Sequence, residues 1–171
     1  EWQGVFLGAG LAAMLMAGLR QVNLRQLSGY ATLILPFIAF LGWYGCATAG
    51  CAYGEAVARM SDFPSWLTWD SKDIFGLMMP RFATQPIGMV LTLFILGIAL
   101  VLTWRGLLKS SRLWLILLLL SIVSFGIAFL RDDYSLFWRG LRAGQWMDLG
   151  MMIFSIIAIG WTQRPMPTHE D

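Results

Sequence analysis

Residues 30–54 read YATLILPFIAFLGWYGCATAGCAYG, an apolar run that carries no charged side chain and ends in glycines and cysteines. Positions 30–49 supply the ~20 residues that a helix needs to cross the hydrocarbon core of a bilayer. Four glycines fall within residues 42–54, and each weakens a helix by about 1 kcal/mol relative to alanine. We therefore predict a span that breaks near Gly50, where bare backbone lets another helix or a lipid head group come close.

The whole chain has the same apolar character. Its 171 residues are 58% hydrophobic and 13% charged, with a mean hydropathy of +0.67, which is too apolar for one soluble core. The other stretches of spanning length are residues 4–19, 87–104, 113–130 and 146–161. We predict an all-α, polytopic integral membrane protein with about five transmembrane helices in one domain, 1–161, and a tail at 162–171.

The distribution of basic residues predicts the orientation. The loops that follow the first and third predicted spans contain only basic charges: Arg20, Arg25, Arg105, Lys109 and Arg112. The segment 55–85 mixes both signs and alternates apolar with polar residues, so we predict that it lies in the outer membrane interface. Because positive loops stay in the cytoplasm, residues 50–86 and 131–145 should lie outside and the tail inside. A net charge of +2 predicts no nucleic-acid partner.

The spans contain little that could support catalysis. Asp148 stands near the outer end of the last span, and we predict an interfacial carboxylate close to Arg139 or Arg142, with a role as a proton relay as the alternative. The one histidine, His169, lies in the tail, which argues against a histidine base. Two cysteines and one remote histidine cannot supply four ligands to zinc. No metal and no cofactor is predicted.

Cys46 and Cys51 can be either free or paired. On an unbroken helix, a separation of five positions turns two side chains about 140° apart, so they would not face each other. If the helix ends near Gly50 they could meet, and an exterior compartment permits disulfides. We predict free, packed thiols, because small apolar cysteines suit close helix contacts.

The stretch at 42–54 resembles the signature of the prolipoprotein diacylglyceryl transferase family, which often reads G-R-x-G-C-x-x-x-G-C-x-Y-G at the outer end of a span. The coinciding residues are Gly42, Gly45, Cys46, Gly50, Cys51, Tyr53 and Gly54. Residues 81–86, RFATQP, resemble the family's histidine-proline-serine/threonine-glutamine turn. Residues 129–132, FLRD, and 144–146, GQW, are similar to its E-F-x-R-x-D and G-Q-W segments. The resemblance implies that two further spans precede residue 1.

The resemblance also implies a function and a location. Members of the family move the diacylglyceryl group of phosphatidylglycerol onto the lipobox cysteine of an exported prolipoprotein in the bacterial inner membrane, which requires phosphate binding and thiol deprotonation. A membrane phospholipid and a lipobox-containing prolipoprotein are the implied partners. Beside the coinciding signature residues, the implied contacts to lipid or head group are Arg81, Gln85, Arg131 and Gln145.

Several polar positions of the family are substituted in this chain. The arginine between the first two signature glycines is Trp43, and a second arginine falls at Ser124 or Phe125. Further polar groups are replaced at Trp2, Ala49 and Ala128. Two hypotheses follow. Either a divergent transferase uses other cations (Arg81, Arg131, Arg139 or Arg142), or the protein is a non-catalytic lipid-binding or accessory subunit of a larger membrane assembly with other membrane subunits as partners. No catalytic residue is assigned.

Overall fold

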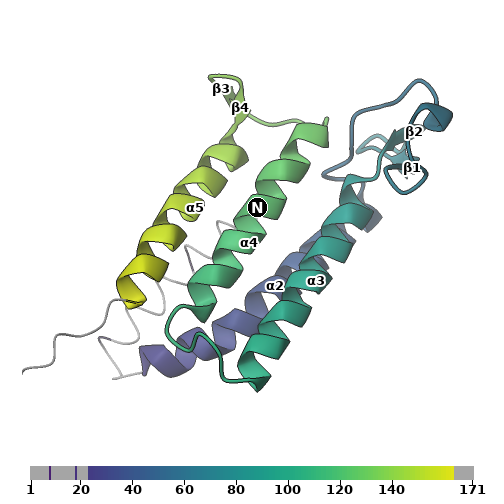
Figure 1. The fold of residues 1–171 in the computed structure, drawn as a ribbon. Coiled ribbons are helices and arrows are strands. Elements are labelled where there is room, and N and C mark those ends of the chain that lie inside the picture. The colour runs from purple at the N-terminus through teal and green to yellow at the C-terminus, as the bar shows by residue number, and fades with distance from the viewer. Residues whose placement is uncertain (1–7, 9–17, 19–22, 164–171) are drawn as a thin grey trace, which may run out of the picture.

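Four long helices run side by side through the part of the chain that the computed structural model describes, which is residues 23–163 together with Gly8 and Gly18 (Figure 1). They are α2 (Leu24–Ala49), α3 (Thr84–Trp104), α4 (Arg112–Ile127) and α5 (Ala143–Thr162). Each is long and apolar enough to cross a membrane, so the predicted polytopic helical fold is confirmed. The predicted first span, 4–19, and residues 164–171 of the tail lie outside the described residues.

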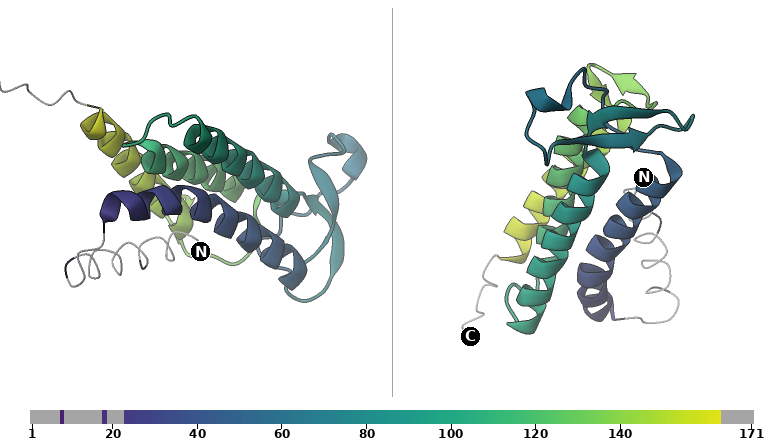
Figure 2. Two further views of the ribbon diagram at one scale, coloured as in Figure 1. Left: turned by 90° about the horizontal axis from the view of Figure 1, so that it is seen from below. Right: turned by 90° about the vertical axis from the view of Figure 1, so that its right-hand side faces the viewer.

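Two small antiparallel hairpins lie at the same end of the bundle, on opposite sides of it (Figures 1 and 2). The first joins α2 to α3 and consists of η1 (Met60–Asp62), β1 (Thr68–Lys72) and β2 (Met78–Phe82), with Thr68 opposite Phe82. The second joins α4 to α5 through η2 (Ala128–Leu130), β3 (Phe137–Trp138) and β4 (Leu141–Arg142). The short turn between α3 and α4 lies at the opposite end (Figure 1).

The first hairpin adds strands to a segment that the sequence predicted only as interfacial. Its turn is built around Asp73, whose Oδ1 accepts hydrogen bonds from the amides of Phe75 at 2.8 Å and Leu77 at 3.0 Å. Gly76 adopts the left-handed φ of +81° that this turn requires, a conformation that glycine reaches without steric cost. The apolar and polar alternation of residues 63–79 is therefore partly that of a strand pair.

Small side chains allow α2, α3 and α4 to pack closely. The buried cluster between them contains Ala39, Ile95, Ala99, Ile116 and Leu120. Two buried hydroxyls bond back to their own helix: Thr32 Oγ1 donates to the carbonyl of Ser28 at 2.8 Å, and Thr92 Oγ1 to that of Gly88 at 2.7 Å. Such bonds satisfy polar groups where no water can reach them.

The helix α2 breaks where the glycines predicted it would. It ends at Ala49, Gly50 has a φ of +70°, and Ala52 is also left-handed at +54°. A Cβ at Gly50 would lie 2.6 Å from the carbonyl oxygen of Asp73, so the predicted close contact is made with the first hairpin. No described atom lies within 4 Å of a Cβ built at Gly42 or Gly45, and these two glycines are not packed against a neighbouring described helix.

Replacing Gly50 tests this break. Gly50→Ala places a Cβ against the Asp73 carbonyl in a left-handed conformation, and we expect a loss of roughly 1–3 kcal/mol in the free energy of unfolding. Thermal unfolding of the detergent-solubilised protein measures the effect. The matched control is Gly45→Ala, which sits on open helix surface and should leave the midpoint unchanged or slightly raised. Equal midpoints for the two variants would contradict the contact.

Candidate functional site

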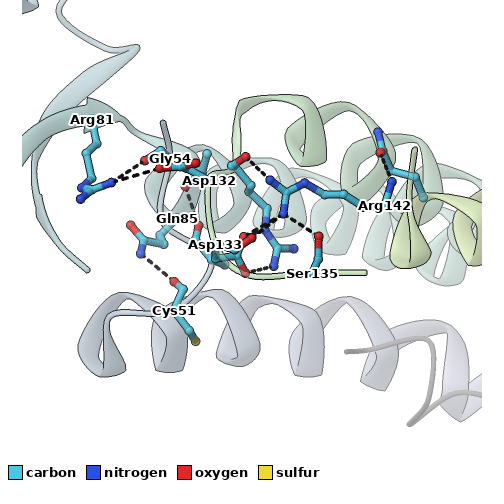
Figure 3. Close-up of polar contacts among 12 residues, drawn as sticks. Cys51, Gly54, Arg81, Gln85, Asp132, Asp133, Ser135 and Arg142 are labelled. Atoms are coloured by element: carbon cyan, nitrogen blue, oxygen red, sulfur yellow. Dashed lines mark hydrogen bonds and ion pairs between the residues drawn. The ribbon is translucent and has the colours of Figure 1, made fainter. Parts of the chain in front are cut away.

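The residues that follow the break in α2 are held through their backbone carbonyls. Gln85 Nε2 donates to the carbonyl of Cys51 at 2.8 Å, and Thr84 Oγ1 donates to that of Ala52 at 2.7 Å (Figure 3 draws the first of these). Thr84 and Gln85 occupy the first turn of α3 and are 0% and 1% exposed. The first turn of α3 thus supplies the donors that the ended helix α2 no longer provides.

The next two carbonyls are bonded by other segments. The amide of Asp132 donates to the carbonyl of Tyr53 at 3.0 Å, and Arg81 Nη1 donates to that of Gly54 at 3.3 Å. Gly54 and Arg131 also form an isolated antiparallel bridge. A Cβ at Gly54 would lie 2.2 Å from the carbonyl oxygen of Phe82, so only glycine allows this approach. Residues 51–54 therefore connect the end of α2 with residues 81–85 and with the loop after α4.

Arg81 is a buried structural residue. Its side chain is 5% exposed and pairs with Asp73 at 3.2 Å and with Asp132 at 3.9 Å. Its guanidinium also lies 4.7 Å from the centroid of the Tyr53 ring, within range of a cation–π contact. Because these contacts occupy one side of the hairpin and not the cavity described next, Arg81 is poorly placed to replace a head-group cation.

A cavity of about 510 Å³ lies between α2, α4, α5 and the loop that follows α4. Five of the predicted site residues line it: Gly42, Cys46, Cys51, Arg131 and Gln145. The other predicted residues do not line it: Gly45, Gly50, Tyr53, Gly54, Arg81 and Gln85. Apart from Gly45, which lies on the exposed surface of α2, the second group contacts the break and the hairpin and shapes the end of the bundle, whereas the first group faces the space where a ligand can fit.

The polar end of the cavity is an ion-pair cluster centred on Asp133. Arg131 donates two hydrogen bonds to the carboxylate of Asp133, from Nε to Oδ1 at 2.8 Å and from Nη2 to Oδ2. Arg142 Nη1 donates to the Asp133 carbonyl at 2.7 Å and to Ser135 Oγ at 2.9 Å, and Nη2 donates to the Arg131 carbonyl (Figure 3). Gln145 Oε1 accepts from the Arg142 amide at 2.9 Å. This cluster fixes the start of α5 against the end of α4.

Sequence reasoning missed Asp133, Tyr134 and Ser135, all of which line the cavity. The available signal was the acidic pair Asp132-Asp133 directly after Arg131, since a bidentate arginine needs a carboxylate nearby. Arg139, predicted as a possible head-group cation, lies 5.0 Å from the Trp138 ring and does not line the cavity.

The prediction that Asp148 need not be buried was wrong. Its side chain is 1% exposed and lines the cavity, instead of lying at the open interface. The reason is that α5 begins at Ala143, so Asp148 falls in its second turn. The loop that carries β3 and β4 leads directly into the start of this helix. Arg142, expected beside it, pairs with Asp133 at 3.5 Å. A carboxylate thus stands on the cavity wall below the ion-pair cluster.

Trp43 lines the cavity at the position where the family signature has an arginine. A Cβ built on Gly88 of α3 would lie 2.3 Å from Cδ2 of the indole. Only a glycine at position 88 leaves room for this ring, so Trp43 is packed directly on the α3 backbone. The indole of Trp43 forms part of the cavity wall, and because it is uncharged it does not replace the arginine of the family signature.

The prediction of free thiols was also wrong. Cys46 and Cys51 form a disulfide, with their Cα atoms 4.6 Å apart. The left-handed residues after Ala49 turn the chain back, and the Cys51 amide donates to the Cys46 carbonyl at 3.0 Å. This is the alternative geometry in which the helix ends near Gly50. Both cysteines line the cavity, so the disulfide forms part of its wall.

These features define a multi-pass helical membrane protein with a partly polar cavity at one end of its bundle. The chain belongs to the prolipoprotein diacylglyceryl transferase family, whose family model matches residues 1–161. A curated relative from Burkholderia lata, named phosphatidylglycerol–prolipoprotein diacylglyceryl transferase, is 27% identical over 192 residues, which cover 96% of this chain and 64% of the relative. The chain therefore spans less than two thirds of that relative. No solved structure matches the chain.

Arg81→Gln should destabilise the fold strongly. It leaves the buried carboxylate of Asp73 without its cation, and removing one partner of a buried pair costs about 3–5 kcal/mol. Thermal unfolding in detergent gives the comparison. The control Arg59→Gln breaks a pair with Asp62 in which the side chains are 79% and 55% exposed, and it should change the midpoint little. A similar small change for both variants would contradict the structural role of Arg81.

The disulfide predicts a specific pattern of thiol labelling. Protein isolated without reductant and denatured should take up no alkylating reagent, and after reduction it should take up two labels, measured as intact mass. Closing so short a loop should stabilise the fold by about 2 kcal/mol. A Cys51→Ser variant, with one unpaired thiol, should take one label without reductant. Two labels on the unreduced wild-type protein would show that the bond is absent.

Proposed function

We propose that this protein holds a membrane glycerophospholipid in the cavity between α2, α4 and α5, and that it acts as a diacylglyceryl transferase-like protein on phosphatidylglycerol or a related glycerolipid. The main support is that one cavity of about 510 Å³ is lined both by signature residues and by the guanidinium groups of Arg131 and Arg142. Ile38 and Ala39 give the same cavity an apolar wall on α2. Mixed lining of this kind suits a head group attached to acyl chains.

The proposed reaction is a transfer to a thiol. A cysteine thiolate of the acceptor attacks the glycerol carbon that carries the phosphate ester, a carbon–sulfur bond forms, and the carbon–oxygen bond to phosphate breaks with release of the head group as a phosphate ester. Arginine suits the phosphate because its planar fork donates two parallel hydrogen bonds. The Nε and Nη2 donors of Arg131 already bind Asp133, so a phosphate at this site must share them or displace the carboxylate.

We propose the bacterial inner membrane as the location, with both hairpins and the cavity on the outer side. The support is that the turn between α3 and α4 carries Arg105, Lys109 and Arg112 and lies at the opposite end of the bundle (Figure 1). Positive loops of this kind are retained in the cytoplasm. The disulfide is compatible with an oxidising exterior. The tail after α5 would then be cytoplasmic.

A non-catalytic lipid-binding or accessory subunit is the second candidate function. It is favoured by the neutral residues at the positions where the family resemblance leads us to expect arginines: Trp43, which lines the cavity, and Ser124 or Phe125, of which Ser124 lines it. Each positioned donor or charge commonly contributes ~100-fold or more to a rate. Loss of both would leave a site that holds a lipid and transfers it slowly or not at all.

A reconstituted assay separates the two candidates. The purified protein is incorporated into phospholipid liposomes with a lipobox peptide, and the mass of the peptide is followed. A diacylglyceryl adduct is the expected result for the transferase, and Arg142→Gln should reduce its rate at least ~100-fold. A lipobox peptide with serine in place of the acceptor cysteine is the control and should gain no mass. No adduct, together with retained phospholipid and stable co-purifying membrane subunits, would favour the accessory subunit.

A further inference from the structure

The turn of the first hairpin presents an apolar surface. Between Asp73 and Arg81 the chain reads IFGLMMP, without a charged side chain. Phe75 at its tip is 80% exposed, and the other exposed apolar side chains are Ile74, Leu77, Met78 and Met79. Turns that face water are usually rich in glycine, proline, asparagine, aspartate and serine. A contiguous exposed patch of large apolar side chains instead marks a surface that contacts a protein or a membrane.

The charged residues on either side of this turn face inward. Asp73 and Arg81 are both buried, and their carboxylate and guanidinium groups pair at 3.2 Å inside the hairpin. Lys72 is exposed at the end of β1, opposite Met78, and a lysine there can keep its ammonium in water while its methylene groups follow an apolar surface. The apolar surface of residues 74–79 can therefore leave water without the desolvation of an unpaired charge.

The backbone of the turn is bonded within the protein. Asp73 Oδ1 accepts hydrogen bonds from the amides of Phe75 and Leu77, and the Asp73 carbonyl accepts one from the Gly76 amide at 3.0 Å. The Asp73 amide in turn donates to the carbonyl of Leu77 at 3.2 Å. Lipid offers no partner to a backbone amide, so a segment enters the membrane at low cost only when such groups are already satisfied. The amides of residues 75–77 meet this condition.

The turn begins at the level where two candidate spans end. β2 ends at Phe82 and the spanning helix α3 begins at Thr84. On the other side, the carbonyl oxygen of Asp73 lies 2.6 Å from a Cβ built at Gly50, the residue that follows α2. Because the ends of spanning helices mark the membrane boundary, the base of the turn lies at this boundary. Figure 2 shows the hairpin at this end of the bundle.

We propose that residues 74–79 form a membrane anchor, whose apolar side chains insert into the lipid leaflet beside α2 and α3. The proposal narrows the interfacial location predicted for the whole segment 55–85 to one turn. It depends on the spanning helices and not on the proposed transfer of lipid. The second hairpin provides a contrast, because its turn consists of Arg139 and Gly140. Arg139 is exposed, and an exposed arginine keeps such a turn at the level of the head groups.

Site-directed spin labelling of the reconstituted protein tests the anchor. The two cysteines of the chain form the disulfide, so Phe75→Cys supplies the single thiol for the label. In phosphatidylcholine liposomes, the depth of the label follows from its collision rates with oxygen, which concentrates in hydrocarbon, and with a water-soluble nickel chelate. We expect the label to lie about 5–10 Å inside the level of the phosphates. The control Arg59→Cys labels a side chain that is 79% exposed, and its label should lie in water.

Each result decides for or against the anchor. Leu77→Cys repeats the measurement at a second exposed position, so the test does not depend on the folding of one variant. A label at 75 or 77 that collides mainly with the nickel chelate would overturn the proposal. Low collision rates with both reagents would mean that protein covers the turn, either another part of this chain or a second copy, and would overturn it as well. An equally deep label at Arg59→Cys would show that the whole segment is immersed, against the restriction to residues 74–79.

Discussion

The structure depends on satisfying the backbone of residues 51–54 where α2 ends. A carbonyl that is buried away from water without a partner costs several kcal/mol, yet the chain leaves α2 through the left-handed residues Gly50 and Ala52 and loses the internal hydrogen bonds of the helix. Every one of the four carbonyls finds a donor outside α2: the first turn of α3 provides two, Arg81 of the first hairpin provides one, and the loop after α4 provides one. One irregular segment thus fixes the ends of three helices relative to each other.

This arrangement explains why the signature residues divide into two groups. Gly50 and Gly54 are required by the break itself, because neither position has room for a Cβ. Gly42 and Cys46 precede the break and line the cavity. In the ion-pair cluster on the other side of the cavity, a side chain again bonds a backbone carbonyl. Arg142 donates to the Arg131 carbonyl and thereby fixes the start of α5 to the loop after α4. Buried arginines at this end hold the protein together as much as they provide charge.

The sequence predicted the four described spans and the break at Gly50, because both follow from composition and from the helix-breaking effect of glycine. It did not predict the disulfide, which depends on the φ angles of Gly50 and Ala52 and not on spacing. The burial of Asp148 escaped for a related reason, since it is set by where α5 begins and by a hairpin of two-residue strands. The resemblance to the family suggested a head-group role for Arg81, but its partners Asp73 and Asp132 become visible only in three dimensions.

The separation of fold-holding residues from cavity-lining residues has a consequence for the chemistry of the site. The side chains that bond the carbonyls of residues 51–54, namely Thr84, Gln85 and Arg81, do not line the cavity. Trp43, Ser124 and Asp148 line it but contribute none of those bonds. A substitution at one of these three wall positions therefore leaves the donors to the carbonyls of residues 51–54 in place. Arg131 and Arg142 are the exception, because they line the cavity and also tie the loop after α4 to the start of α5, so a substitution at either one alters both the wall and the fold.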